Sequence, residues 1–581
     1  MKNLLKINVT FLVMFMMSIV NLLFVHYYFL QTIALEMDSF KTSYLDNLLA
    51  CLLDVTFILA IVWIFTLRRL RISLGITFFI TLIWSFCNAF YARFFHQYLS
   101  WSSIGQAGNL TDPIVVDSMM VGFQFIDLYY PLMAILFCWL YIRYKHQDVK
   151  SNSLRSILMT WLCCIVMCLT VHSLYLFHPT KSIISVYEKT MFTPPLYNSL
   201  WPNWTVFHKG FFRRIILEQL TRESDIKLTK EQEQEIEKEY TDYHQRVTQR
   251  TASDHVKNII FILVESYLSV TSDLFVDGKE ITPNLNQLKR DSNVYYNGHM
   301  HPNVATGESS DGQFIYMTGI LPLHSEITVS KAKDNTLIGL PKLLKEATPK
   351  MQSAILIPTN PTLWEQDTMS PSYGFDKLYS KIDYQEDMND KEDSDMGDDK
   401  IIAYASEKDK LLCPPFFFMI LTMSTHHPYT TYIEHGFQIN DKNITEKYRN
   451  YLINCHYTDM MIGKYLQNLK DKGLYDTSMI VIASDHDAHL KFLDMEGKIS
   501  NELPFYIING GIDNARAWTG ECNQLDVYTT ILDIMGIDSK WRGLGHTLLN
   551  KEYQNSVTDK IQELSDWIIY SNYFKDKNNH P

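Results

Sequence analysis

The sequence lacks the features that would assign it to a nucleotide- or nucleic-acid-binding class. It contains no Walker-type phosphate-binding loop, no dinucleotide-binding glycine fingerprint and no internal repeat. Its 52 Lys and Arg residues are outnumbered by 64 Asp and Glu residues, which gives a net charge of −12. Because a basic surplus is missing, we do not expect nucleic acid among the partners.

Cysteine is also scarce, with nine residues in 581. Three of them, Cys413, Cys455 and Cys522, lie in the more polar part of the chain, and an odd set of three permits at most one disulfide. The sequence therefore predicts no disulfide scaffold. The other six fall in strongly apolar stretches, at positions 51, 87, 138, 163, 164 and 168.

Long hydrophobic runs, in contrast, dominate residues 1–177. Each run is long enough to cross the hydrocarbon core of a bilayer. The first follows Lys2 and Lys6 as in a signal peptide, but its apolar run is too long and further runs follow, so we interpret it as an uncleaved span. The predicted spans are residues 8–30, 48–67, 72–92, 123–142 and 156–176.

The loops between these spans differ in basic charge. Two loops carry the Lys and Arg residues, and the other two are poor in them. Basic loops face the cytoplasm, so the N-terminus is expected inside and everything after the fifth span outside. The protein is thus predicted to sit in the cell membrane with an extracytoplasmic domain. The basic residues are Arg68, Arg69 and Arg71 in one loop and Arg143, Lys145, Lys150 and Arg155 in the other.

The polar part of the chain predicts an α/β domain. We divide it into a juxtamembrane connector with interfacial helices (178–255), the α/β domain (256–550) and a C-terminal helix and tail (551–581). For the aromatic part of the connector, an ordinary packing segment is the alternative to an interfacial helix. Apolar strand-like runs alternate with helical stretches, which indicates a mainly parallel sheet between helices. The predicted strands are 258–264, 353–357, 416–421, 479–483 and 505–508, and the predicted helices begin near 309, 445 and 525.

Metal-ligating side chains follow two of these strands. Glu265 comes directly after 258–264, and Asp485 and His486 come after 479–483. Ligands of parallel α/β sheets gather at the carboxyl ends of the strands, so we expect the three side chains to converge. Two carboxylates and an imidazole suit a divalent metal ion. A loop N-cap is the alternative role for Glu265.

Two adjacent hydroxyls, Ser309 and Ser310, precede a helical hydrophobic run. A serine at a helix N-terminus has backbone N–H groups and the positive dipole end beside it, which favours attack on an anionic phosphoryl group. We therefore predict Ser309 as a nucleophile whose hydroxyl completes the metal shell. The stretch is also typical of a loop with an ordinary helix N-cap, and that alternative stays open.

Several motifs occur together in one order along the chain. They are Glu265, Gly307-Glu-Ser-Ser-Asp311, His426-His-Pro428, Asp485-His486, Gln524–Gly536 and Trp541-Arg-Gly-Leu-Gly545. This ordered set resembles the lipoteichoic acid synthase family of membrane phosphoglycerol transferases, which belongs to the alkaline phosphatase and sulfatase superfamily. The similarity extends into the membrane part, to residues 88–95 and 106–112.

The resemblance implies an alkaline phosphatase/sulfatase-like fold and a two-step transfer. Ser309 would attack the head-group phosphate of a membrane phospholipid, and the covalent intermediate would pass to an envelope glycan or glycolipid. The metal would be Mn²⁺, with Mg²⁺ or Zn²⁺ as alternatives, held by Glu265, Ser309, Asp485 and His486. His426 matches a histidine that contacts the phosphoryl or leaving group. Phosphatidylglycerol is the favoured donor, followed by a phosphoethanolamine lipid.

Three positions depart from the family pattern. Ser309 stands where the family has threonine, and Glu308 where it has lysine. Gln366, in Trp364-Glu-Gln366, stands where the resemblance implies an arginine that grips phosphoglycerol together with the tryptophan. A neutral glutamine cannot form the bidentate charged pair that arginine offers phosphate. Trp364 and Gln366 remain predicted substrate contacts, and the head group of the donor is left open.

Other functions stay open at this point. His489, close behind Asp485 and His486, is a candidate substrate contact or ligand of a second metal, and a supporting role is the alternative. A metal-dependent phosphoester hydrolase of the same superfamily and a non-catalytic envelope-binding membrane protein are alternative functions. A sulfatase activity is not expected, because Ser309 is followed by Ser-Asp-Gly-Gln and not by x-Pro-x-Arg.

Overall fold

The structure, a computed structural model, divides the chain into two compact units that are described separately. The first comprises residues 1–105 and 122–224, and the second comprises 106–121 and 225–581. The structure describes residues 9–32, 44–66, 69–95, 97–104, 122–143, 227–241, 250–324, 326–392, 395–429 and 436–575, together with short pieces between 116 and 120 and between 206 and 215.

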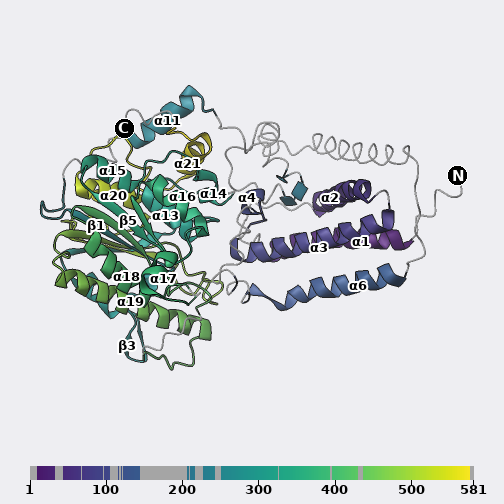
Figure 1. Cartoon of the computed structure of the whole chain (residues 1–581), viewed down its shortest axis with the longest axis horizontal. Coiled ribbons are helices and arrows are strands. Elements are labelled where there is room, and N and C mark those ends of the chain that lie inside the picture. The colour runs from purple at the N-terminus through teal and green to yellow at the C-terminus, as the bar shows by residue number, and fades with distance from the viewer. Residues whose placement is uncertain are drawn as a thin grey trace. The chain divides into compact units, whose positions relative to one another are not determined.

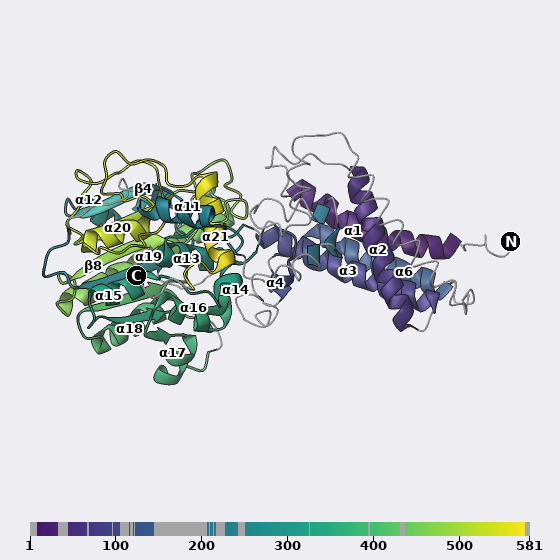
Figure 2. The ribbon, with the colours of Figure 1, turned by 90° about the horizontal axis from the view of Figure 1, so that it is seen from above.

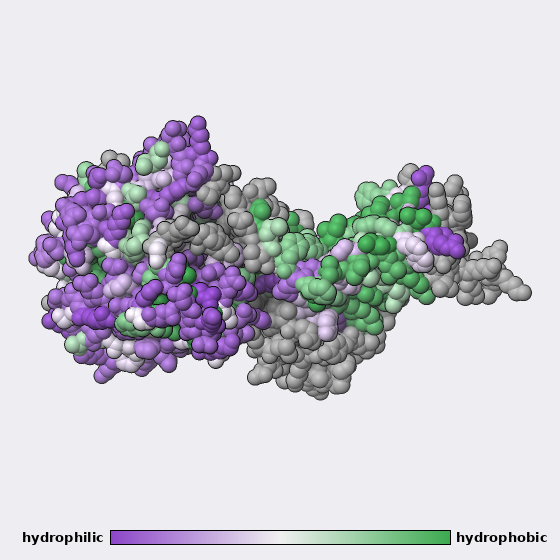
Figure 3. Space-filling model, turned by 90° about the horizontal axis from the view of Figure 1, so that it is seen from below, coloured by the Kyte–Doolittle hydropathy of each residue, from purple (hydrophilic) through white to green (hydrophobic). Residues whose placement is uncertain are grey.

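The first unit contains four helices that are long and apolar enough to cross a membrane. They are α1 (Val9–Thr32), α2 (Tyr44–Phe65), α3 (Leu70–Phe95) and the run from η3 (Phe125–Leu128) into α6 (Tyr129–Arg143). Figure 3 shows hydrophobic residues gathered over this unit and hydrophilic ones over the other. The first four predicted spans are confirmed, and the fifth, 156–176, lies outside the described residues.

Polar contacts inside the first unit join its helices. Arg93 on α3 forms a buried ion pair with Asp127 at the start of the fourth span. Asp54 on α2 accepts a hydrogen bond from the backbone N–H of Phe211 at 2.7 Å. Phe211 itself is buried and stacks on His26 of α1. The connector residues around Phe211 therefore pack on the helices of this unit.

The second unit is built on an eight-stranded mixed sheet in the order β10-β4-β9-β8-β1-β7-β5-β6. Five neighbouring pairs are parallel, and β9 is antiparallel to both β8 and β4. The mainly parallel sheet is thus confirmed. The strands are β1 (Asn258–Val264), β4 (Val294–His301), β5 (Gln352–Leu356), β6 (Lys377–Tyr379), β7 (Phe416–Leu421), β8 (Ser478–Ser484), β9 (Leu503–Ile508) and β10 (Cys522–Asn523).

Strands β1 and β8 form the centre of this sheet because nothing polar interrupts them. Every residue of both strands is buried, as expected for parallel strands covered on both faces. They pair in parallel with Val264 beside Ser484. The residues that follow the two strands therefore emerge side by side at the same edge of the sheet.

Helices cover both faces of the sheet (Figures 1 and 2). One group consists of α12 (Pro283–Arg290) and α18 (Asp398–Lys408), which both pack on α19 (Glu446–Asp471). The other consists of α13 (Ser309–Thr318), α14 (Thr328–Ala332), α15 (Leu340–Ala347), α20 (Asp526–Met535) and α21 (Asp559–Ser571). Further described helices of this unit are α11 (Lys230–Thr241), α16 (Gln366–Tyr373) and α17 (Lys381–Met388).

The helix predicted at 445–472 is present as α19, and sequence signals mark both of its ends. Thr445 caps α19 by accepting a hydrogen bond from the backbone N–H of Tyr448, and Gly473 follows the helix in a left-handed conformation with φ +70°. Leu452, Leu466 and Leu469 are buried on the sheet side. Capping chemistry at both ends and an apolar face between them fix the extent of the helix.

Candidate metal centre

Three potential metal ligands converge at the carboxyl ends of β1 and β8. Glu265 follows β1, and Asp485 and His486 follow β8; all three side chains are at most 6% exposed. The Nε2 atom of His486 lies 3.2 Å from Oε1 of Glu265 and 3.7 Å from Oδ2 of Asp485. One ligand atom from each residue lies within 4.8 Å of the others, close enough to share one ion.

Ser309 completes this arrangement from the first turn of α13. Its Oγ donates a hydrogen bond to Oε2 of Glu265 at 3.2 Å and lies 3.1 Å from Nε2 of His486. Ser309 is the first residue of the helix, and Glu308 occupies the N-cap position, so the Ser309 hydroxyl faces the ligands and does not cap the helix. Oxygen, oxygen and nitrogen ligands with a hydroxyl beside them fit a divalent metal ion.

The electrostatics of the cluster also favour a cation. Burial opposes ionisation of Glu265, but His486, His426 and Asp485 together outweigh it and hold the pKa of this carboxyl well below its usual range. Burial and the charge of Glu265 together raise the pKa of Asp485 well above its usual range. Two buried carboxylates beside one imidazole thus compete for a single positive charge, and a divalent ion would satisfy both.

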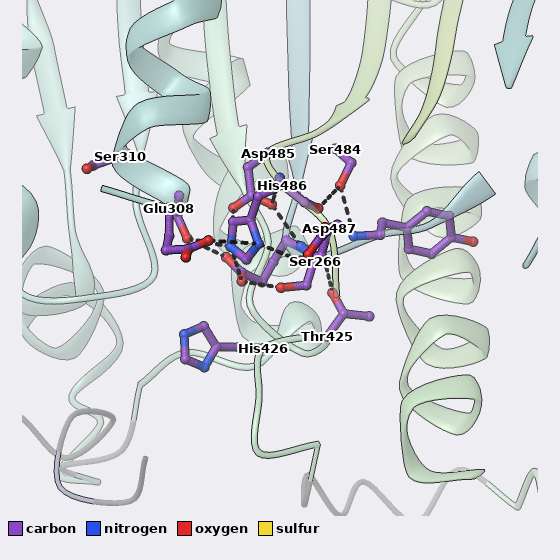
Figure 4. Close-up of polar contacts among 12 residues, drawn as sticks. Ser266, Glu308, Ser310, Thr425, His426, Ser484, Asp485, His486 and Asp487 are labelled. Atoms are coloured by element: carbon purple, nitrogen blue, oxygen red, sulfur yellow. Dashed lines mark hydrogen bonds and ion pairs between the residues drawn. The ribbon is translucent and has the colours of Figure 1, made fainter. Parts of the chain in front are cut away.

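The loop before α13 holds Ser309 in place through backbone hydrogen bonds. The carboxylate of Asp311 accepts from the N–H groups of Ala305 at 3.0 Å and Gly307 at 2.8 Å. Ser310 Oγ donates to the carbonyl of Gly307 at 2.7 Å. These bonds fix a turn in which Glu308 has φ +45°, a conformation that non-glycine residues rarely adopt. The turn directs Ser309 toward Glu265 and His486, and Figure 4 shows Glu308 directed toward His486.

Gly312 sets the distance between α13 and β8. A Cβ atom built on Gly312 would lie 2.3 Å from the backbone carbonyl oxygen of Asp485. We therefore expect Gly312→Ala to destabilise the protein by about 1–3 kcal/mol through overpacking and to reduce activity, because Ser309 and Asp485 would move apart. Urea unfolding and turnover of a chromogenic phosphodiester measure the two effects.

Gly278→Ala is the comparison for this substitution. Nothing lies within 4 Å of a Cβ at Gly278, whose φ is +71°, so its cost comes from the backbone conformation and does not reach the ligands. Activity equal to that of the wild type in Gly312→Ala would contradict the close approach of α13 to β8.

Residues missed by the sequence analysis support the ligands. Ser266 Oγ donates to Oε1 of Glu265 at 2.7 Å, and the backbone N–H of Ser266 donates to Oδ1 of Asp485 at 2.8 Å. Nε2 of Gln524 donates to the backbone carbonyl of Asp485 at 2.6 Å. Ser266 stands directly next to a predicted ligand in the sequence, and this adjacency is the signal that could have indicated it.

The predicted phosphoryl-contacting residue, His426, lies beside the cluster (Figure 4). It follows β7, stacks on His427 with ring centroids 4.4 Å apart, and uses Nδ1 to contact the carbonyl of His427. Burial lowers the pKa of His426, so its neutral form is favoured. No hydrogen bond joins it to Ser309 or Glu265 in the described part of the chain.

Of the three predicted substrate contacts, His489 lies near the ligands. Its ring centroid is 5.3 Å from that of His486, and it forms a second group of potential ligands with Glu308 and His486. Gln366, by contrast, is buried in reciprocal amide hydrogen bonds with Gln313 of α13. Trp364 precedes α16 with φ +53°, and among the described residues neither it nor Gln366 is hydrogen-bonded to the ligands.

Comparison with protein families identifies the soluble domain. Residues 257–537, which contain Glu265, Ser309, Asp485 and His486, match the sulfatase family. This is a sulfatase-family domain. Over most of its length the chain is related to lipoteichoic acid synthases. The resemblance predicted from the sequence motifs is therefore confirmed.

Three bacterial lipoteichoic acid synthases are among the relatives. Over 525 residues the chain is 25% identical to lipoteichoic acid synthase of Staphylococcus saprophyticus, covering 85% of this chain and 78% of that protein. It is 27% identical to the Staphylococcus aureus (strain USA300) enzyme, covering 81% and 74%. It is 28% identical to lipoteichoic acid synthase 2 of Bacillus subtilis, covering 52% of this chain and 48% of that protein. The chain thus spans about half the length of this relative.

A solved structure shares the fold over nearly the whole length. It is the integral membrane lipooligosaccharide phosphoethanolamine transferase A from Neisseria meningitidis, with a TM-score of 0.50, 13% identity, and coverage of 92% of this chain and 97% of that one. The chain with the sulfatase domain thus combines N-terminal membrane-spanning helices with a soluble domain, as this membrane protein does.

Proposed function

We propose that the protein is a metal-dependent phosphotransferase that moves a phosphoglycerol or phosphoethanolamine head group from a membrane phospholipid to an envelope glycan or glycolipid. The observation that carries the proposal is Ser309 Oγ, placed at the N-terminus of α13 within 3.2 Å of Glu265 and 3.1 Å of His486. A serine hydroxyl among metal ligands suits covalent phosphoryl transfer. The relatedness to lipoteichoic acid synthases supports a lipid donor and an envelope acceptor.

Each residue of the centre has a role in this proposal. Glu265, Asp485 and His486 would hold a divalent ion, for which Mn²⁺ is the first choice, and a bound ion lowers the pKa of a coordinated hydroxyl. Ser309 Oγ attacks phosphorus, the Oγ–P bond forms, and the P–O bond to diacylglycerol breaks. The positive end of the helix dipole of α13, which begins at Ser309, favours the anionic phosphoryl group at this position.

His426, whose neutral form is favoured, has the position of a contact to the phosphoryl or the leaving group in the first step, because its ring lies beside the cluster. The proton that leaves Ser309 Oγ on attack balances the proton that the departing diacylglycerol oxygen takes up. In the second step an acceptor hydroxyl attacks the phosphorus, and the Oγ–P bond of Ser309 breaks. The membrane helices would keep the domain at the bilayer that contains the donor, on the outer side as the basic loops predict.

The test follows both products of the proposed reaction. The full chain, reconstituted in vesicles with Mn²⁺ and either phosphatidylglycerol or phosphatidylethanolamine, is expected to release diacylglycerol and to gain the mass of one head-group phosphate. Lipid extraction and intact-protein mass spectrometry measure these changes. Release of free glycerol phosphate or ethanolamine phosphate with added acceptor glycolipid left unmodified would instead establish a hydrolase.

A further inference from the structure

Glu308 is an acidic residue of the centre to which the proposed mechanism gives no role. It directly precedes Ser309, and its side chain is one-fifth exposed. Its Oε2 lies 3.7 Å from Nδ1 of His486, and Figure 4 shows the carboxylate directed at that ring. The backbone of Glu308, with φ +45° and ψ −117°, favours glycine, yet the chain has a carboxylate there. A strained acidic residue beside a nucleophile is a candidate for a functional contact.

The groups around Glu308 oppose its ionisation. Burial and the acidic neighbours Asp487, Asp311 and Glu265 raise the pKa of Glu308 to about 8, although the charge of His486 lowers it. None of the ion pairs or hydrogen bonds of Glu308 or Ser309 in the described residues involves Lys or Arg. A phosphodiester attacked by Ser309 is anionic and would lie beside this carboxylate. A head group that carries its own cation would stabilise the carboxylate form of Glu308 and offset the repulsion between this carboxylate and the phosphodiester.

A second metal ion fits this position less well than an organic cation. Nδ1 of His486 lies 2.6 Å from the backbone carbonyl of Asp487, which can only accept, so Nδ1 carries the proton. The lone pair of His486 is then on Nε2, which faces Ser309 and Glu265. Glu308 and His489 remain from the second ligand group, fewer than the three protein ligands of a typical catalytic metal site.

We propose that Glu308, assisted by His489, binds the ammonium group of the donor, so that the donor is a phospholipid with a primary amine in its head group, of the phosphoethanolamine class. This inference rests on the proposed function and names its substrate. In such a head group, two carbons and one oxygen separate the amine from phosphorus. This short spacing lets the phosphate lie at Ser309 while the ammonium lies at the preceding residue, Glu308. The bond changes are those of the proposed transfer, and phosphoethanolamine remains on Ser309 after diacylglycerol leaves.

The test compares the two head groups on the full chain. Vesicles that contain phosphatidylethanolamine or phosphatidylglycerol are supplied with Mn²⁺, and diacylglycerol release is measured. We expect kcat/KM for phosphatidylethanolamine to exceed that for phosphatidylglycerol by at least about tenfold. Glu308→Gln should remove most of this preference by slowing the ethanolamine lipid alone, and Glu308→Lys should reverse it. His489→Ala should weaken it. Glu280→Gln, at a carboxylate paired with Arg290, is the matched control that keeps the preference.

The outcomes separate the inference from the function on which it rests. Preferential use of phosphatidylglycerol, with a phosphoglycerol adduct on Ser309, would overturn the inference and leave the proposed function standing. Equal loss of both lipids in Glu308→Gln would assign the residue a structural role and also overturn it. Two bound metal ions per chain, with one lost in His489→Ala, would show that the cation is a metal. If neither lipid is consumed and no adduct forms, the proposed function fails together with the inference.

Discussion

Ser309→Ala is expected to abolish the covalent adduct and to lower turnover of the lipid donor by a factor on the order of 10⁴ or more, as removal of a nucleophile does in other covalent enzymes. The reason is that the Ser309 hydroxyl lies among the predicted ligands, 3.1 Å from Nε2 of His486. Intact-protein mass spectrometry detects the adduct, and diacylglycerol release gives the rate. The fold should persist, because the hydroxyl bonds to the ligand side chains and not to the helix backbone.

Ser310→Ala is the matched control for this experiment. Ser310 is the neighbouring residue, but its Oγ donates to the carbonyl of Gly307 at 2.7 Å and is buried away from the ligands. Its loss should cost about 1 kcal/mol of stability and leave the adduct intact. An adduct that survives in Ser309→Ala and disappears in Ser310→Ala would show that the neighbouring hydroxyl is the nucleophile.

The convergence of the ligands was predictable because it depends on simple patterns. Strands β1 and β8 are uninterrupted apolar runs, and a parallel sheet brings the residues after them to one edge. The register of Val264 beside Ser484 places Glu265 next to Asp485. Ser309 was predicted from the helix that follows it. The roles of these residues in metal binding and catalysis remain proposals.

Other features are not encoded in local patterns. Strand β9 is buried on both faces like a parallel strand, so hydrophobicity does not reveal that it runs antiparallel to β8. Strand β4 contains Asn297, Gly298 and two histidines, and it forms because β9 and β10 pair with it on either side. The pairing of Gln366 with Gln313 joins residues that are 53 positions apart. Such long-range contacts follow from the tertiary fold and not from local propensity.

Asp485→Asn is expected to eliminate metal binding while the protein without metal keeps its stability. Oδ1 of Asp485 accepts hydrogen bonds from the backbone N–H groups of Ser266 at 2.8 Å and His486 at 2.7 Å, and an asparagine oxygen can accept both. The substitution also removes a buried carboxylate that competes with Glu265 for the charge of His486. The thermal midpoint without metal should therefore stay equal or rise.

The response to Mn²⁺ then separates the wild type from the variant. At a free ion concentration 100 times the dissociation constant, binding should stabilise the wild type by about 2.7 kcal/mol and raise its melting temperature. In Asp485→Asn only Glu265, His486 and the Ser309 hydroxyl remain as ligands. The melting temperature of this variant should rise little or not at all at the same Mn²⁺ concentration. Thermal unfolding of the full chain in detergent, with and without Mn²⁺, provides the comparison and does not depend on turnover.

Asp398→Asn shows whether this response is specific to the metal centre. Asp398 is equally buried, and its Oδ1 likewise accepts from two backbone N–H groups, those of Met423 at 2.8 Å and Ser424 at 3.0 Å. Its Oδ2 also accepts from Thr458 at 2.6 Å, so its substitution should lower stability without metal and keep the full rise with Mn²⁺. An undiminished rise in Asp485→Asn would exclude Asp485 as a ligand. If the rise of the melting temperature with Mn²⁺ is lost equally in both variants, Asp485 is not specifically required. Stabilisation by Mn²⁺ would then depend on the integrity of the sheet edge and not on direct coordination by Asp485.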